Sequence, residues 1–313
     1  MNGERANMTE QTAGREWVGF SLRRVWIIAV NTLTESMRQK VYNILLLFAL
    51  VVIASASFFS QFSFGEEAEQ VASVQLKFIK DFGLGAISVF GMLIAIVGTA
   101  QLIPNEVENR TIYTILAKPV RRFEFLLGKY SGSVLLIFVS LVMMSVMFGA
   151  EMAFKQQKLV GDVLQEERQT AAAGGQVDRQ EVQRMVTGIR TDAFDPNLVK
   201  GVILILVKLA LLAAITLLAS TFSTSMVFNV TVAFMVFFAG HLVGTAKEMW
   251  EHSALARYFL ALIPDLGMFN VADDIILGNA IPWVHVAKVA LYGFVYLAAV
   301  VAASHFIFSD REI

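Results

Sequence analysis

The sequence predicts an all-α integral membrane protein with six transmembrane helices. Of its 313 residues, 56% are hydrophobic and 16% are charged. Soluble domains carry about 25% charged residues, so this chain has too few for an ordinary water-exposed surface. Six apolar stretches approach the roughly 20 residues that a helix needs to cross a bilayer. The absence of cysteine excludes disulfides and thiolate chemistry, and the net charge of -1 argues against a nucleic-acid-binding surface.

The N-terminal region is predicted to lie at the membrane surface. Residues 1–14 are polar, and we expect them to be disordered. Residues 15–40 are predicted to form an interfacial amphipathic helix, in which Trp17, Phe20 and Trp26 suit the membrane interface. Arg23 and Arg24 of this helix would face lipid headgroups.

The membrane domain is predicted in two halves, with spans one to three in 41–150 and spans four to six in 199–313. The individual spans are predicted at 41–62, 84–103, 126–149, 201–221, 226–244 and 284–308. Residues 245–283 are too polar to span. We expect them to form short helices that enter the outer leaflet as a re-entrant segment, which requires that protein bury their backbone.

Residues 151–198 form the one sizeable polar segment. They predict an extracytoplasmic hairpin of two amphipathic helices, near 151–170 and 176–191, separated by "AAAGG". Val182, Met185, Val186 and Ile189 recur on one helical face. The hairpin is either a packing lid or a docking site for a periplasmic partner or an exit gate, and the sequence leaves both open.

The distribution of lysine and arginine predicts that both termini are cytoplasmic. With the N-terminus inside, the inner segments hold twelve of these residues and the outer segments hold eleven. Seven of the eleven lie in 151–200, where eight acids balance them. Long loops cross a membrane with little regard to charge, and without this loop the ratio is twelve to four.

Motifs for catalysis and metal binding are missing from the sequence. It has no G-x-x-x-x-G-K-[ST] phosphate loop, no H-E-x-x-H and no G-x-S-x-G, and its four histidines are scattered. We therefore predict no catalytic residue and no metal ligand. Lys208 is the notable charge within a span: it either extends its amine outward to the interface or contacts a substrate or counter-ion. Gly83, Gly85, Gly91 and Gly98 allow close helix packing, within the chain or across a dimer.

The stretch "IPNEVENRTIYTILAKPVRRFEFLLGK", residues 103–129, predicts a short amphipathic helix across the ends of two spans. We expect Pro104 to end the second span and Asn105 to cap the new helix, with Glu106 and Glu108 in its first turn. Pro119 would end it, and Arg121 and Arg122 would anchor the following elbow at the headgroups. Force on such a helix would move both spans together.

This stretch resembles the signature of ATP-binding cassette type-2 (ABC-2) permeases. The matching positions are Glu106, Glu108, Thr111, Leu116, Pro119, Val120, Arg122, Glu124, Leu127, Gly128 and Lys129. Arg110 departs from the family pattern, which usually has glycine before the threonine. "STFSTSMVFNV" resembles the family's turn between spans four and five, and "FIFSDREI" resembles its tail. The overall style is similar to the NosY-like subgroup.

The resemblance implies a permease of the type V ABC exporter class in the bacterial cytoplasmic (inner) membrane. It implies a second permease subunit, identical or homologous, and two copies of a separate ATPase that bind ATP and Mg; this chain would carry no cofactor. Residues 105–117 would be the coupling helix. Glu106, Glu108, Arg110 and Thr111 would transmit movement from the ATPase, and Arg121 and Arg122 would hold the elbow. The second and fifth spans would line the cavity, which places Phe234 and Phe238 near the substrate path. Lys208, the charge within the fourth span, is the third substrate-path candidate.

Two alternative functions remain at the level of sequence. A membrane scaffold without transport would form a complex that moves no solute. An ion-gradient-driven carrier would transport without an ATPase, but the predicted spans contain no aspartate or glutamate for a proton relay.

Overall fold

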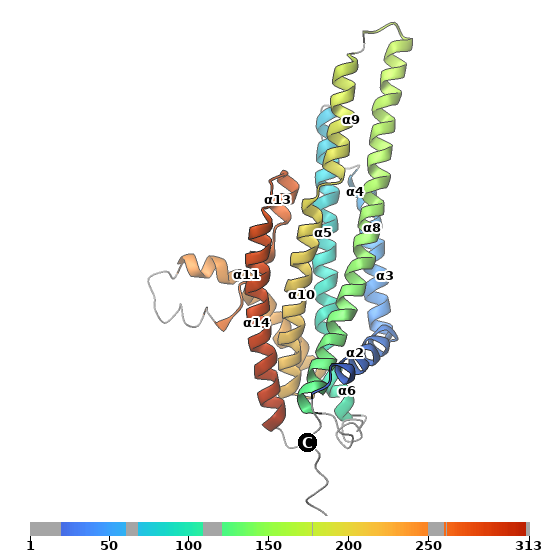
Figure 1. Ribbon diagram of the computed structural model, residues 1–313. Coiled ribbons are helices and arrows are strands. Elements are labelled where there is room, and N and C mark those ends of the chain that lie inside the picture. The colour runs from blue at the N-terminus through green and yellow to red at the C-terminus, as the bar shows by residue number, and fades with distance from the viewer. Residues whose placement is uncertain are drawn as a thin grey trace, which may run out of the picture.

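The structure, a computed structural model, describes residues 20–60, 68–108, 121–176, 178–249, 260 and 262–310. This described part contains helices and no strands. Most of its long helices lie side by side in an elongated bundle, and the end of α11 (Met226–Met249) points out of its side (Figure 1). Six helical stretches are long and apolar enough to cross a membrane. They are Lys40–Ser60, Ala72–Glu108, Arg122–Ala172, Arg179–Phe222, Met226–Met249 and Trp283–Phe308. The predicted fold class is therefore confirmed.

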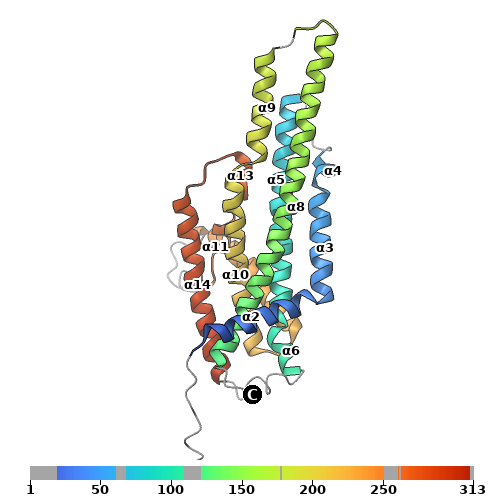
Figure 2. The same cartoon turned by 45° about the vertical axis from the view of Figure 1, so that its right-hand side comes forward.

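Helix α2 (Leu22–Met37) crosses the bundle near the end that also holds α6 (Leu102–Glu108), which we call the lower end (Figure 2). Small side chains of α2, including Ala29 and Thr32, are buried against the bundle, whereas Trp26 is exposed. The predicted residues 15–19, with Trp17, lie outside the described residues. Helices α3 (Lys40–Ala54) and α4 (Ala56–Ser60) then follow the bundle upward.

Helices α5 (Ala68–Ala100) and α10 (Asn197–Phe222) form the centre of the bundle. Their most apolar windows are 72% and 78% buried, against 22% for those of α11 and α14. Glycine lets neighbouring helices approach α5: a Cβ at Gly91 would lie 2.5 Å from Leu209, and one at Gly83 would overlap the ring of Phe148. These glycines pack within the chain, so a dimer is not needed to explain them.

Helix α8 (Arg122–Ala172) runs through the membrane domain and beyond it. Its 51 residues make it about 75 Å long at 1.5 Å per residue, far more than a bilayer core of about 30 Å requires. Its upper part pairs with α9 (Arg179–Ala193) as the projecting hairpin in Figure 1. Between these helices Gly174 adopts φ 76°, and the Asp178 side chain caps α9 by accepting a hydrogen bond from the Gln180 N–H.

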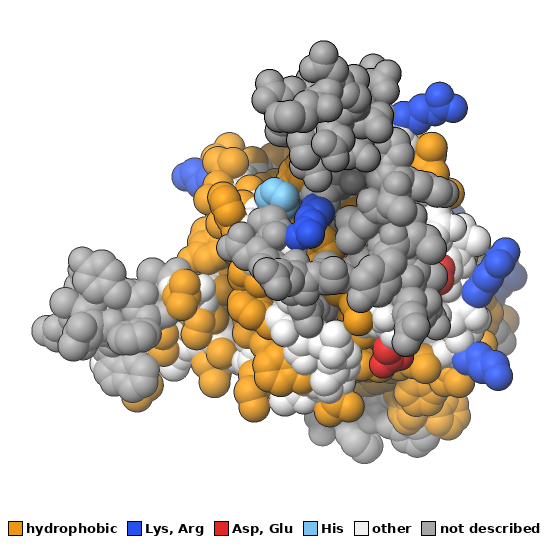
Figure 3. Space-filling model, turned by 90° about the horizontal axis from the view of Figure 1, so that it is seen from below, with side chains coloured by type: hydrophobic (Ala, Val, Ile, Leu, Met, Phe, Trp, Pro, Cys, Tyr) orange, Lys and Arg blue, Asp and Glu red, His pale blue; other side chains and the backbone are white. Residues whose placement is uncertain are grey.

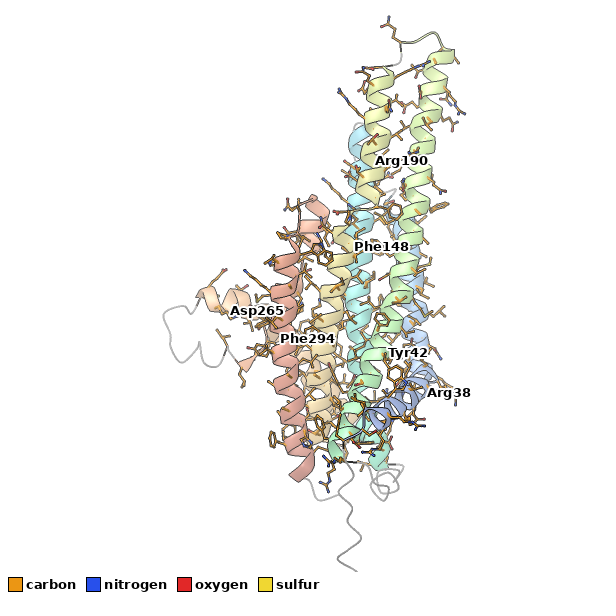
Figure 4. All side chains as sticks on the ribbon, viewed as in Figure 1. Arg38, Tyr42, Phe148, Arg190, Asp265 and Phe294 are labelled. Atoms are coloured by element: carbon orange, nitrogen blue, oxygen red, sulfur yellow. The ribbon has the colours of Figure 1, made fainter. Side chains whose placement is uncertain are left out.

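The segment between α11 (Met226–Met249) and α14 (Trp283–Asp310) contains the 3-10 helix η1 (Gly267–Phe269) and α13 (Ala272–Leu277). Asp265, labelled in Figure 4, joins both flanking helices. Its carboxylate lies 3.1 Å from the Lys247 amine of α11, and its backbone N–H donates to the Tyr292 hydroxyl of α14. Residues 250–259 and 261, within the predicted re-entrant segment, lie outside the described residues.

Candidate functional site

The described start of the predicted coupling helix is α6, and it begins earlier than expected. Helix α5 ends at Ala100, and α6 already contains Pro104 as its third residue. The Asn105 N–H donates to the Gln101 carbonyl at 3.0 Å, so the prediction that Asn105 caps the helix is wrong. Proline fits here because the N–H groups of a first helical turn have no intrahelical partner to lose. Residues 109–120, including the predicted site residues Arg110 and Thr111, lie outside the described residues.

A buried lysine joins α6 to two other helices. The Lys129 amine of α8 lies 2.5 Å from a carboxylate oxygen of Glu106 and 3.6 Å from one of Glu35 in α2. Lys129 is 2% exposed and Glu106 is 8% exposed. Breaking a buried ion pair by removing one partner is strongly destabilising, so this contact holds α6 to α8. Glu108, in contrast, is exposed.

A second buried ion pair fixes the start of α2 to the start of α8. The Glu124 carboxylate is fully buried and accepts hydrogen bonds from Arg24 Nε at 2.8 Å and Nη2 at 2.7 Å. It also accepts from the backbone N–H groups of Ser21 and Arg121. The hydrogen bond to Glu124 raises the pKa of Arg24 above its ordinary value. A bidentate, charge-assisted pair of this kind sets the position of both helices.

Two glycines of α8 allow α2 to cross at close range. A Cβ at Gly128 would lie 2.7 Å from the Ile28 Cβ, and one at Gly132 would lie 2.6 Å from the Thr32 Cβ. The spacing is Gly-x-x-x-Gly, which brings both glycines to one face of α8. The neighbouring residues Gly128 and Lys129 therefore have different roles. Gly128 lets α2 pack closely on α8, and Lys129 approaches the Glu35 carboxylate of α2.

Arg122 connects α8 to the lower end of α14. One of its terminal nitrogens donates to the Phe308 carbonyl at 3.4 Å, and the rings of Phe125 and Phe308 stack with centroids 6.1 Å apart. Arg121 precedes the first residue of α8 and is exposed. Seen from below (Figure 3), lysine and arginine side chains project at the edge of this end, and many of the described side chains are hydrophobic. Contact of Arg121 and Arg122 with lipid headgroups stays a prediction.

The structure separates the predicted substrate-path residues. Lys208 is 3% exposed, and its amine donates to the Ser88 hydroxyl of α5 at 2.8 Å. It therefore lies within the bundle, and the prediction that it extends outward is wrong. Phe238 is 62% exposed on α11, and its ring stacks on that of Phe234. Lys208 thus lies between α10 and α5, whereas Phe238 lies on an open face of α11.

The hairpin carries an acidic groove between α8, α9 and the first turns of α5. The groove has a volume of about 350 Å³. Its floor includes Leu76, Val182 and Met185, and Arg184 is a basic residue in its wall. Its acidic residues are Glu166, Glu167, Asp178, Glu181 and Asp192.

The sequence motif contains Glu106, Glu124 and the Gly128-Lys129 pair. It did not indicate that Glu124 binds Arg24, that Lys129 approaches Glu35, or that Gly132 admits α2. A signal was present for Arg24, which lies among apolar residues of α2, but Glu35 lies among polar residues and carries no such signal. Only the crossing of α2 over α8 shows which charges they meet. Among the described residues, no group of three or more histidines and carboxylates could hold a metal ion.

Comparison with known protein families identifies the family of this chain. The profile described as "ABC-2 family transporter protein" matches residues 26–313, which include both buried ion pairs except Arg24. No curated protein matches the sequence. The family match covers most of the chain and agrees with the six membrane-length helices. The chain therefore belongs to the ABC-2 family of transporter proteins.

Proposed function

We propose that this chain is the permease subunit of an ABC transporter whose energy comes from a separate ATPase. Two ATPase copies, with ATP and Mg, would dock at the lower end, and a second permease subunit, identical or homologous, would complete the membrane part. Both termini would be cytoplasmic, in a bacterial cytoplasmic membrane. Family membership supports a multi-pass membrane subunit that works with an ATPase, and permeases of this family are typically non-catalytic.

The observation that carries the proposal is the ionic junction at Lys129. Its amine binds Glu106 of α6 and approaches Glu35 of α2, and Lys129 itself belongs to α8. A push on α6 would therefore reach a membrane span and the surface helix at once, through this buried side-chain junction. Glu108 is exposed beside this junction, and the sequence that follows it contains Arg110 and Thr111. We assign these three residues to the contact with the ATPase.

The substrate path would lie between the two permease subunits. Helix α11 exposes Met235, Phe238 and Leu242, an apolar surface that fits lipid-like or amphipathic cargo. The ring of Phe234 stacks on that of Phe238 and extends this apolar surface by one helical turn. Lys208 would act indirectly here, by holding α5 against α10 through Ser88.

The test is purification of the tagged chain from its host in mild detergent, with partners identified and quantified by mass spectrometry. We expect a near-stoichiometric ATPase subunit. Glu108→Ala should release it, because the exposed carboxylate contributes to docking, while the permease keeps its elution volume. Glu166→Ala, an exposed glutamate on the hairpin, is the matched control and should retain the ATPase. A stable complex without any nucleotide-binding subunit would overturn the proposal and favour a scaffold.

A second function, docking of an extracytoplasmic partner, is supported by the acidic groove of the hairpin. Five carboxylates around an apolar floor favour a partner segment that is basic on one face and apolar on another. A photo-crosslinking residue at Val182, inside the groove, should capture such a partner in cells. The same residue at Arg190, an exposed position of α9 outside the groove-lining set, should not. Equal capture at both positions, or capture of an acidic protein, would contradict this assignment.

A further inference from the structure

A lateral groove opens between α2 and α14 near the lower end of the bundle. Its volume is about 540 Å³, within the roughly 300–1,000 Å³ range of small-molecule sites. Trp26 of α2 lies on one side, and Phe294 and Leu297 of α14 lie on the other. Val134 and Tyr130 of α8 contribute to the floor. Figure 2 shows α2 crossing in front of α8 beside the lower part of α14, and Phe294 is labelled in Figure 4.

The chemistry of the groove suits a hydrocarbon chain. Most of its lining side chains are aliphatic or aromatic. The Tyr130 hydroxyl donates to the Ala210 carbonyl at 3.1 Å, so its hydrogen is already used within the protein. An apolar ligand therefore fits without leaving that buried donor unsatisfied.

The groove lies where membrane lipid can reach it. Helices α8 and α14, which form its floor and one wall, are membrane-length apolar helices. Its other wall is α2, whose Trp26 is 60% exposed, as expected of an aromatic residue on a helix at the membrane surface. Arg23 is exposed and lies three residues from Trp26, so the two occupy neighbouring positions on α2.

We propose that this groove is a binding site for one membrane phospholipid, with an acyl chain in the groove and the phosphate beside Arg23. The chain would fill the space between α2 and α14, where α2 packs mainly on α8. The inference depends on membrane insertion of the bundle and not on coupling to an ATPase. A lipid held between helices should exchange more slowly than lipid on the convex outer surface.

Fluorescence of Trp26 tests the proposal on the full chain. Trp17, Trp250 and Trp283 are changed to Phe, which leaves Trp26 as the single tryptophan. The protein is reconstituted with phosphatidylethanolamine that carries a dibrominated acyl chain, a contact quencher, and is then transferred to an excess of unbrominated lipid. We expect most of the Trp26 quenching to persist after the transfer, and lipid analysis of the washed protein to find about one brominated lipid per chain.

Matched variants separate the groove from the general lipid surface. Val134→Phe fills the floor and should abolish the retained quenching, whereas Val146→Phe, the same change at an exposed position of α8, should preserve it. Arg23→Gln should speed the loss of quenching while the chain remains monodisperse. Complete recovery of fluorescence in the parent protein would overturn the proposal. Absence of quenching even in fully brominated membranes would also overturn it, and would indicate that a second copy of the chain covers the groove.

Discussion

Lys129 is a buried charged residue at the lower end of the bundle, and its desolvation must be offset by nearby carboxylates. Its amine is removed from water, which is costly, and the cost is offset only because Glu106 and Glu35 lie close by. The two carboxylates come from different helices. The same charge that requires compensation therefore fixes how α6, α2 and α8 sit relative to one another.

At this residue, Lys129→Met is expected to destabilise the protein by about 3–5 kcal/mol, because Glu106 and Glu35 lose the buried cation that they share. The double variant Lys129→Met, Glu106→Gln should recover part of the loss, since the buried carboxylate is then neutralised together with the amine. Thermal unfolding followed by size-exclusion chromatography in detergent would measure both. Lys158→Met, at an exposed lysine of the same helix, serves as the control and should change little. Equal losses in the single and double variants would show that the ion pair is not what stabilises this junction.

Residue roles near this junction were only partly predictable. The sequence assigned Glu106 and Glu108 the same task, but two residues apart on a helix face nearly opposite directions, and the structure buries one and exposes the other. Two alternatives were open for Lys208: its long stem could carry the amine outward to the interface, or the amine could contact a substrate or counter-ion. Lys208 lies in α10, the most buried membrane helix described, where Ser88 is its hydrogen-bond partner.

At the scale of elements, the crossing of α2 over α8 depends on missing side chains. Gly128 and Gly132 let the backbone of α2 approach. A Cβ added at Gly128 would lie 3.1 Å from the Val25 carbonyl oxygen, and one added at Gly132 would lie 2.7 Å from the Ala29 carbonyl oxygen. The Glu124–Arg24 pair fixes the register of the crossing at one end. Lys129 and Glu35 add a weaker contact further along α2.

Gly132→Ala should therefore push α2 away from α8. The added methyl group meets backbone as well as Thr32, and overpacking of this kind costs about 1–3 kcal/mol. Gly149→Ala is the control on the same helix: an added Cβ there has nothing within 4 Å, so the higher helix propensity of alanine should leave stability unchanged or raise it by up to about 1 kcal/mol. Melting temperatures of the two variants, measured side by side, distinguish close packing from a general intolerance of substitution in α8.

The existence and order of the helices were predictable, but their lengths were less so. Apolar runs located the six spans because the bilayer imposes a minimum length of hydrophobic sequence. Helices α5 and α8 continue well past those runs, since a change from apolar to polar residues marks the edge of the membrane and not the end of a helix. The start of α6 was misplaced because Pro104 was taken as a terminator, although proline is also at home in a first helical turn.

At the scale of the whole molecule, the two ends of the bundle differ in kind. The lower end gathers the buried ion pairs of Glu106 and Glu124, whereas the opposite end extends as a thin hairpin with an acidic groove. Lysine and arginine flanking the spans favour the lower end as cytoplasmic by twelve to four once residues 151–200 are set aside. The proposed ATPase docking requires this orientation, and the reverse orientation would exclude it.

Cysteine labelling should therefore give opposite results at the two ends. The natural chain has no cysteine, so a single introduced one reports without background. Ala173→Cys, in the exposed turn of the hairpin, should react with a membrane-impermeant maleimide in intact spheroplasts. Arg38→Cys, at the exposed end of α2 (Figure 4), should react only after the membrane is permeabilised. The reverse pattern would place α6 outside the cell, away from any source of ATP, and the permease proposal would fail with it.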